Sequence, residues 1–147
     1  MGALLLSRDV PGTLESLFNT IVAPTTWDHW FGMHHDFIGT PPERLVEGSV
    51  VVAEVLLHGM LEEVEWTVTR LDKPNRIALR GKGRTGIQYD LTYWLQSTES
   101  GANITAGFTF SGPLITNQVT KALEQHGYEQ LDNTLGQLAE LACARHE

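Results

Sequence analysis

Apolar residues recur at helical spacing over one long stretch near the C-terminus. The apolar positions lie three or four residues apart in each half of the stretch: Ile115, Val119, Ala122, Leu123, Leu131, Leu135, Leu138 and Ala142. Pro113 suits the first turn of a helix, where a backbone N–H has no intrahelical partner to lose. The apolar stripe shifts around the helix near Gly127, because one turn takes about 3.6 residues. We predict a single helix from Pro113 to Ala142 that is bent or packs against a curved surface.

The first third of the chain predicts one strand followed by two short helices. Residues 4–10 read as a short strand, and residues 13–22 present one apolar face at helical spacing. Residues 25–31 predict a second, shorter helix that carries Trp27 and Trp30. Two short helices directly after a first strand are unusual for a simple hairpin sheet.

The middle of the chain alternates apolar and polar residues, which is the pattern of half-buried strands. The predicted strands cover residues 36–39, 49–58, 61–71, 76–83, 86–96 and 102–111. Short turns join them, which favours an antiparallel meander. Tyr89, Leu91 and Tyr93, for example, alternate with Asp90 and Thr92. One face of the sheet is therefore apolar, and we expect the long C-terminal helix to cover it.

The composition is that of a globular domain with excess negative charge. The chain has 147 residues, 41% of them hydrophobic, and a formal net charge of −8. One domain over residues 1–147 accommodates this length, and the charge argues against nucleic-acid binding, which normally uses a basic patch. No stretch approaches the ~18 apolar residues of a membrane span, and residues 1–10 do not resemble a signal peptide. Cys143 is the only cysteine, so we expect no intrachain disulfide, and we expect a cytoplasmic protein.

The apolar face of the predicted sheet mixes large residues that have polar tips with small residues. Trp66, Tyr89 and Tyr93 belong to the first kind, and Gly81 and Ala106 to the second. Small residues leave space on a concave sheet, and a buried tyrosine or tryptophan needs a hydrogen-bond partner. The pattern fits a solid core whose polar tips reach backbone or water. It fits equally a partly apolar cavity with a few hydrogen-bonding groups, as in small-molecule sites.

The order of elements and several local marks resemble a known superfamily. The marks are Val10-Pro11 before the first helix, Trp27 and Trp30 in the second, Glu47-Gly48, Trp66-Thr67-Val68 and Gly112-Pro113. Together they resemble the helix-grip fold of the START/Bet v 1-like (SRPBCC) superfamily, and particularly its bacterial polyketide cyclase/dehydrase-like branch. The chain also looks like an actinobacterial group in which some members are labelled toxins of toxin–antitoxin pairs. The resemblance implies an α+β fold whose curved antiparallel sheet, of about seven strands, wraps around the long C-terminal helix.

The resemblance further implies a cavity between the sheet and the C-terminal helix. We expect this cavity to bind a small hydrophobic molecule, such as a lipid, a fatty acid or an aromatic polyketide. The candidate lining residues are Trp30, Phe37, Ala53, Val55, Leu57, Trp66, Val68, Leu79, Tyr89, Leu91, Tyr93, Phe108, Phe110, Val119, Leu123 and His126. Fold resemblance alone does not establish an activity, because one fold hosts many functions.

His126 is the titratable residue of most interest, because it lies in the apolar stripe of the first half of the long helix. One interpretation is a core histidine with one satisfied hydrogen bond. The enzymatic alternative is a polyketide cyclase or dehydratase in which His126 and Tyr89 or Tyr93 act as acid and base. Replacing His126 with Ala would then abolish turnover, whereas a carrier would lose only some affinity. A third hypothesis is a toxin-like regulator that acts through a protein partner. It requires an exposed apolar patch, and the exposure of Trp94 and Trp27 is its simplest test.

We predict neither a metal site nor a cofactor. His34 and His35 are adjacent, and neighbouring residues of an extended segment point to opposite faces, so they do not bind one ion together. The stretch from Gly81 to Gly86 matches the dinucleotide-binding pattern by letter, but it joins two strands instead of a strand and a helix. We expect a monomer or a weak homodimer, and Trp94, on the polar face of the sheet, as a surface or dimer contact.

Overall fold

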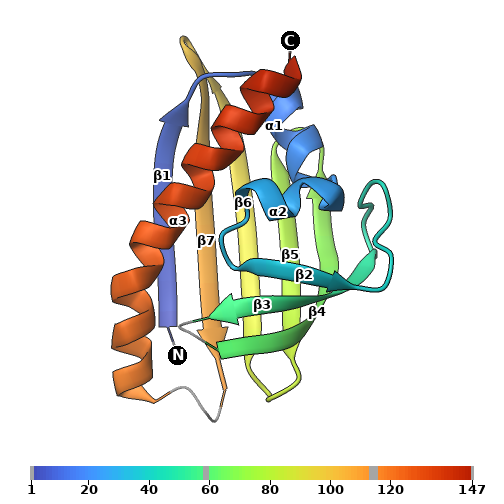
Figure 1. Ribbon diagram of the computed structural model, residues 1–147. Helices are drawn as coiled ribbons and strands as arrows, with labels where there is room; N and C mark the ends of the chain where they lie inside the picture. The colour runs from blue at the N-terminus through green and yellow to red at the C-terminus, as the bar shows by residue number, and fades with distance from the viewer. Residues whose placement is uncertain (1, 58–59, 113–115, 147) are drawn as a thin grey trace.

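Seven strands form one curved antiparallel sheet in the order β1-β7-β6-β5-β4-β3-β2 (Figure 1). The computed structural model describes residues 2–57, 60–112 and 116–146, with the side chains of residues 57, 60, 119, 123 and 143–146 left out. The strands are β1 (Gly2–Val10), β2 (His34–Ile38), β3 (Val50–Leu57), β4 (Met60–Asp72), β5 (Arg76–Gly83), β6 (Gln88–Thr98) and β7 (Gly101–Ser111). The helices are α1 (Leu14–Ile21), the 3-10 helix η1 (Pro24–Thr26), α2 (Trp27–Trp30) and α3 (Asn117–His146). The predicted α+β helix-grip fold is confirmed.

The sheet has one apolar face because its side chains alternate with a period of two. In β7, every second side chain from Ala102 to Phe110 is buried. β6 pairs with β7 in continuous register, so Tyr89 lies opposite Phe110 and Tyr93 lies opposite Ala106. The predicted meander is therefore correct, and consecutive strands from β2 to β7 are neighbours.

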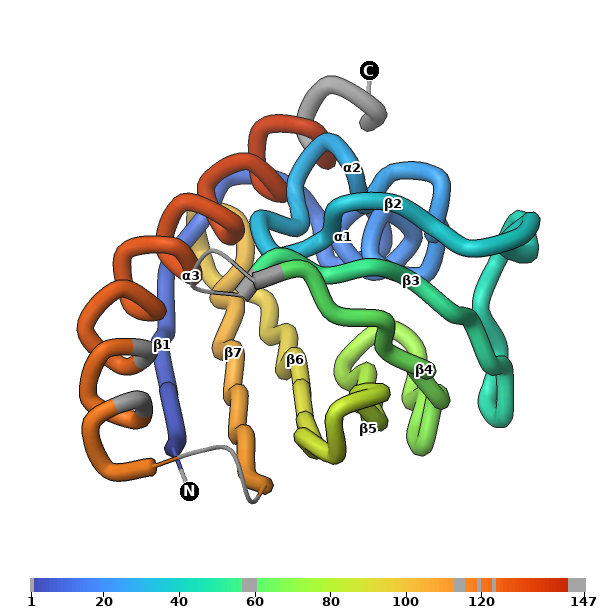
Figure 2. Tube along the Cα trace, turned by 60° about the horizontal axis from the view of Figure 1, so that its bottom comes forward, coloured from blue at the N-terminus to red at the C-terminus, as the bar shows by residue number. Residues whose placement is uncertain are grey.

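α1 and α2 cover part of the concave face of the sheet (Figure 2). Thr13 caps α1, where its hydroxyl accepts a hydrogen bond from the Ser16 backbone N–H at 3.1 Å. The apolar side of α1, including Phe18, is fully buried. In α2, Trp27 and Trp30 are buried as well, so this one-turn helix turns both tryptophans into the core.

α3 closes the β1 side of the molecule. It begins at Asn117, and the predicted start, Pro113, lies outside the described residues. The described side chains that α3 buries all lie in its second half: Thr134, Leu135, Leu138, Ala139 and Ala142. There the Ser16 hydroxyl of α1 donates a hydrogen bond to the Ala142 carbonyl at 2.5 Å. In the first half, Gly127 lies against Leu4 of β1, where a Cβ would come within 2.5 Å of the leucine side chain.

The concave face is thus covered by two different parts of the chain. α3 contacts β1, α1 and α2. In the middle of the sheet, Trp30 of α2 reaches β6, and Phe31, which follows α2, reaches β4. No helix in the described part of the chain combines the length and apolar composition needed to cross a membrane.

Candidate functional site

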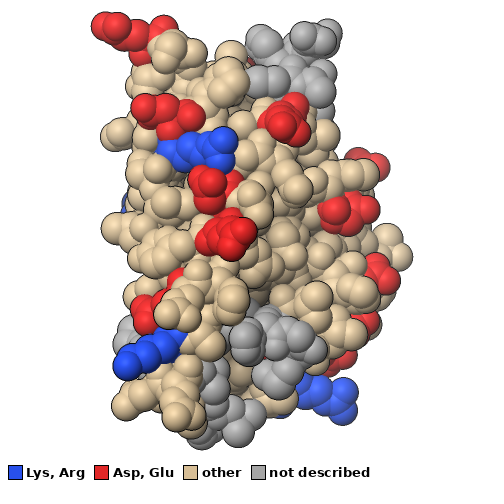
Figure 3. All heavy atoms as spheres, turned by 60° about the vertical axis from the view of Figure 1, so that its left-hand side comes forward, with Lys and Arg blue, Asp and Glu red and all other residues tan. Residues whose placement is uncertain are grey.

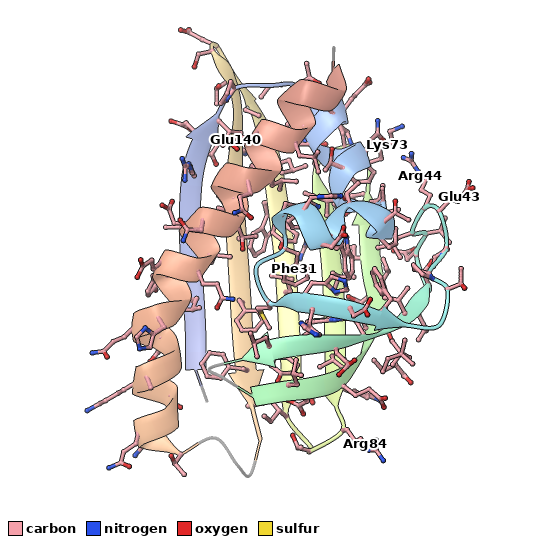
Figure 4. The ribbon with its side chains drawn as sticks, in the orientation of Figure 1. Phe31, Glu43, Arg44, Lys73, Arg84 and Glu140 are labelled. Atoms are coloured by element: carbon pink, nitrogen blue, oxygen red, sulfur yellow. The ribbon has the colours of Figure 1, made fainter. Side chains whose placement is uncertain are left out.

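A chain of aromatic rings crosses the concave face between α2 and the sheet. The centroid distances along it are 6.1 Å for Tyr93–Trp30, 5.5 Å for Trp30–Phe31, 6.3 Å for Phe31–Trp66, 5.9 Å for Trp66–Tyr89 and 5.9 Å for Tyr89–Phe108. These separations are typical of interacting aromatic pairs. Phe31, which follows α2 (Figure 4), joins Trp30 of the helix to Trp66 of the sheet. Sequence reasoning placed Phe31 in the short helix but did not include it among the lining residues.

Two tryptophans of this region have their indole N–H groups satisfied. Trp27 donates to the Ile21 carbonyl at 2.9 Å, and Trp30 donates to the Thr26 hydroxyl at 2.9 Å. The Thr26 hydroxyl in turn donates to the backbone carbonyl of Thr20 at 2.8 Å. These bonds lock the short helical segment, and they leave its tryptophans without spare hydrogen-bonding capacity.

Two other buried polar groups on the concave face lack such partners. Within the described part of the chain, the Trp66 indole N–H and the Tyr93 hydroxyl have no hydrogen-bond partner. Both side chains are almost entirely buried. A buried polar group without a partner costs about 1–3 kcal/mol, so native proteins usually satisfy it. Burial raises the pKa of Tyr93 far above its ordinary value, so its hydroxyl stays protonated and can donate.

Glu62 places a buried carboxylate at the other end of the aromatic chain. Its Oε2 accepts a hydrogen bond from the Tyr89 hydroxyl at 2.6 Å, and its Oε1 accepts bonds from the Thr85 backbone N–H at 3.2 Å and from the Thr85 hydroxyl. Glu62 is 7% exposed. Burial and the bond to Glu62 raise the pKa of Tyr89, which keeps this hydroxyl protonated too. Arg84 in Figure 4 marks the β5–β6 hairpin beside this end.

Sequence reasoning missed Glu62, although a signal was present. Residues 62, 64, 66 and 68 share one face of β4, so the alternation that buries Trp66 also turns Glu62 inward. The bond between Glu62 and Tyr89 bridges β4 and β6 across the intervening strand β5. Glycine at position 83 of β5 leaves the necessary space, because a Cβ there would lie 2.1 Å from the Glu62 carboxylate.

The predicted lining residues divide into three groups. The following are buried in the core: Trp30, Ala53, Val55, Trp66, Val68, Leu79, Tyr89, Leu91, Tyr93, Phe108 and Phe110. Phe37 is partly buried against the core. The side chains of Leu57, Val119 and Leu123 lie outside the described part of the structure.

His126 is on the apolar stripe by spacing, but it is not buried as a cavity-lining residue would be. Its side chain is exposed, whereas Tyr89 and Tyr93 are buried. The reason is that the described residues in the first half of α3 are only partly buried or exposed, so the apolar spacing there does not correspond to a buried face. The Tyr89 hydroxyl bonds to Glu62, and the Tyr93 hydroxyl has no partner among the described residues. Neither tyrosine is therefore paired with His126 by a hydrogen bond in this structure.

The outer surface bears on the remaining hypotheses. Trp94 is 37% exposed and stacks on the Arg76 guanidinium, with 5.6 Å from its ring centroid to Arg76 Cζ. Trp27 is fully buried, so it does not belong to an exposed apolar patch that could contact a protein partner. Figure 3 shows acidic side chains spread over the α3 and β1 side of the molecule, in line with the net charge of −8.

The chain is similar in sequence to two bacterial proteins. No family model matches the chain. A Mycobacterium tuberculosis protein named Rv1546 and described as uncharacterised is 27% identical over 141 residues, which cover 96% of this chain and 99% of that protein. A second M. tuberculosis protein, named Toxin Rv0910, is 27% identical over 119 residues, covering 81% of this chain and 83% of the toxin.

Solved structures resemble the chain over nearly its whole length. Protein CV1439 from Chromobacterium violaceum has a TM-score of 0.74 at 16% identity, covering 97% of this chain and 98% of that one. The two chains share the α+β helix-grip-like architecture. DynU16, a protein from the dynemicin biosynthetic locus, has a TM-score of 0.66 at 14% identity, covering 95% of this chain and 46% of DynU16. At these identities the helix-grip neighbours establish the architecture, and the activity has to be argued from the site.

Proposed function

We propose that this helix-grip protein binds a small, largely apolar molecule between the concave face of its sheet and its helices, in the cytoplasm. A lipid, a fatty acid or an aromatic polyketide-like molecule has the required character. The observation that carries the proposal is the pair of buried, unpartnered donors, Trp66 Nε1–H and Tyr93 Oη–H, within the described part of the chain. An acceptor oxygen on the bound molecule would satisfy one or both donors.

The energetics of such binding favour a molecule with apolar bulk and few polar atoms. Burial of apolar surface contributes about 25 cal/mol per Å², less the cost of ordering the ligand. Each donor that the ligand satisfies recovers part of the roughly 1–3 kcal/mol that an unpaired buried group costs. The aromatic rings beside Trp66 and Tyr93 would pack against flat or extended apolar groups.

The similarity to DynU16 supports the polyketide-like end of this range, because that protein comes from the dynemicin biosynthetic locus. We also propose that this protein belongs to the polyketide cyclase/dehydrase-like branch of the superfamily. The enzymatic alternative, with His126 as acid or base, gains no support from the exposed position of His126. The toxin-like alternative draws on the relative named Toxin Rv0910 and on exposed Trp94.

The proposal is tested by following indole N–H resonances in a protein labelled with nitrogen-15. Fatty acids, sterol-like molecules and aromatic polyketides are titrated, and the Trp66 resonance is compared with those of Trp27 and Trp30. We expect a saturable shift at Trp66, whose N–H is unpartnered among the described residues, and smaller shifts at the other two, whose N–H groups are already bonded. A panel that leaves the Trp66 resonance unchanged contradicts binding at this position.

The matched variant is Tyr93→Phe, which removes one of the two unpartnered groups without changing the shape of the ring. We expect it to weaken binding of an acceptor-bearing ligand by about 3- to 10-fold, which corresponds to one net hydrogen bond. Leu91→Met, on the same strand and face, keeps the apolar character and serves as control. Equal loss in both variants would show that packing alone, without the hydroxyl, determines the affinity.

A further inference from the structure

Glu62 is a buried carboxylate whose negative charge is not paired with a cation. The ion pairs of the described residues are Arg8–Asp132, His29–Asp28, Arg70–Asp72 and Arg80–Asp90, and none of them includes Glu62. Burying a charge is costly unless it is paired or fully hydrogen-bonded. Glu62 instead receives hydrogen bonds from Tyr89 and Thr85, which carry no positive charge.

The hydrogen bonds of Glu62 leave part of its acceptor capacity unused. A carboxylate has about four lone-pair sites, two on each oxygen. Thr85 donates twice to Oε1, through its backbone N–H and its hydroxyl, whereas Tyr89 donates once to Oε2. Oε2 therefore retains acceptor capacity for a further donor. The arrangement holds the carboxylate in one orientation and keeps one acceptor position available.

Aromatic rings lie beside Tyr89, the residue whose hydroxyl donates to Glu62 Oε2. The Tyr89 ring lies 5.9 Å from the Trp66 ring and 5.9 Å from the Phe108 ring, centroid to centroid. The faces of tyrosine and tryptophan rings attract cations, and the attraction increases where water is excluded. Trp66 is fully buried, so water is excluded from its ring beside Tyr89.

We propose that Glu62, Tyr89 and the adjoining aromatic rings form a subsite for a protonated amine of the bound molecule. This inference rests on the proposed function and specifies one end of the ligand. The ammonium group would donate to Glu62 Oε2 and lie against the Tyr89 ring, which neutralises the buried charge. A neutral hydroxyl would satisfy the acceptor but not the charge, and a carboxylate would be repelled by it.

The two ends of the aromatic chain then have opposite roles. The end at Tyr93 provides an O–H donor and takes an acceptor oxygen, whereas the end at Glu62 provides an anionic acceptor and takes a cation. The ligand that fits both is an apolar or aromatic amine with a carbonyl or ether oxygen at a distance from the nitrogen. Plain fatty acids, which carry an anionic head, fit the Glu62 end poorly.

The test uses three probes that share one apolar scaffold and differ in head group: 2-naphthylmethylamine, 2-naphthalenemethanol and 2-naphthoic acid. Their affinities for the full chain are measured by NMR titration at pH 7, where the amine is protonated and the acid is ionised. We expect the amine to bind about tenfold or more tightly than the acid, as one charge-assisted hydrogen bond allows. The alcohol should have an intermediate affinity.

Glu62→Gln removes the charge and keeps the size of the side chain, and we expect it to bring the amine-to-acid affinity ratio close to one. Glu65→Gln is the matched control, because Glu65 lies on the same strand but on the exposed face, three residues further along β4. The control should retain the ratio of the unmodified protein. An amine preference that persists in Glu62→Gln, or equal binding of all three probes to the unmodified protein, overturns the inference and leaves the proposed function standing.

A second readout does not depend on the folding of any variant. In the unmodified protein, protons of the methylene beside the ammonium group should show nuclear Overhauser effects to the ring protons of Tyr89 or Phe108. Effects only to rings at the other end, such as Trp30 or Tyr93, would overturn the assignment of the amine to Glu62. Failure of all three naphthalene probes and of the wider ligand panel to bind would overturn the subsite and the proposed function together.

Discussion

The six-membered ring of Trp66 lies directly against the backbone of Gly81 on the neighbouring strand. A Cβ at Gly81 would come within 2.7 Å of Trp66 Cζ3 and 2.8 Å of a Val64 methyl group. Trp66 and Gly81 are opposite each other in the register of β4 and β5. The glycine thus leaves free the space that the six-membered ring of Trp66 occupies.

This contact predicts that Gly81→Ala destabilises the protein. Trp66 is fully buried and cannot move aside freely, so we expect a loss of about 1–3 kcal/mol in the free energy of unfolding. Urea denaturation followed by tryptophan fluorescence measures it. Gly107→Ala is the control, because its Cβ would approach Trp94 at 3.1 Å on the outer face, where the partly exposed ring can shift. A similar loss in both variants would contradict the argument from the rigidity of Trp66.

The two buried tyrosines predict opposite effects of the same chemical change. Tyr89→Phe removes the hydroxyl that donates to buried Glu62, and we expect the free energy of unfolding to fall by about 1–3 kcal/mol. Tyr93→Phe removes a hydroxyl that has no partner among the described residues, so in the ligand-free protein it should change stability by less than about 0.5 kcal/mol or increase it. Chemical denaturation of the two variants side by side checks this. Equal destabilisation by both would mean that the Tyr93 hydroxyl is satisfied in solution.

Thr26 connects three polar groups in the segment that carries the tryptophans. Its hydroxyl accepts from Trp30 Nε1, and its single proton is shared between the carbonyls of Thr20 and Ala23, each 2.8 Å away. Thr26→Val keeps the shape but removes every one of these bonds, and we expect a loss of about 2–3 kcal/mol in unfolding free energy. Exposed Thr25 provides the control, since Thr25→Val should stay within about 0.5 kcal/mol. Thermal unfolding of both variants decides between a specific bond network and a general intolerance of valine.

His34 predicts a pH dependence of stability. Burial lowers its pKa below the usual value of about 6.5, and the nearby carboxylates of Asp28 and Asp36 offset this only in part. Below pH 6.5 the unfolded chain takes up this proton while the folded protein resists it. The free energy of unfolding therefore falls as the pH drops through 6.5, and it levels off once folded His34 is also protonated.

The measurement compares urea unfolding at pH 7.5 and pH 5.5 in the unmodified protein and in His34→Phe, which retains a ring against Phe37 and Trp27. We expect the variant to lose less stability between the two pH values. His35→Gln is the control, because His35 is the exposed neighbour of His34. It shows whether the loss of any histidine changes the pH dependence of stability. Parallel losses in the unmodified protein and His34→Phe would rule out His34 as the source.

Much of the architecture could be predicted from the sequence because local periodicity carries it. The period of two along 76–83 and 102–111 predicts strands that coincide with β5 and agree with β7 within one residue. A strand so patterned must turn its apolar side chains to one face, whatever its neighbours. The same reasoning placed Trp66, Tyr89 and Tyr93 together on the concave face, where the structure has them.

Local periodicity alone did not indicate which titratable side chains are buried. His126 shares the helical spacing of apolar residues, but the first half of α3 is only partly buried, so its side chain is exposed. Spacing along a helix defines which residues share a face, but only packing decides whether anything covers that face. A search for candidate acids or bases that relies on spacing therefore selects His126 and overlooks Glu62.

By itself, the sequence determined the meander of consecutive strands, the apolar face of the sheet and the presence of a long C-terminal helix, because each depends on residues close together in the chain. The tertiary structure decided that β1 pairs with β7, since these strands are far apart in the sequence. The tertiary structure alone decided that Glu62 meets Tyr89. These residues lie on β4 and β6, and they bond across β5 because Gly83 has no side chain to separate them. Such a contact depends on strand register and on an empty position on a third strand, and no local pattern contains both.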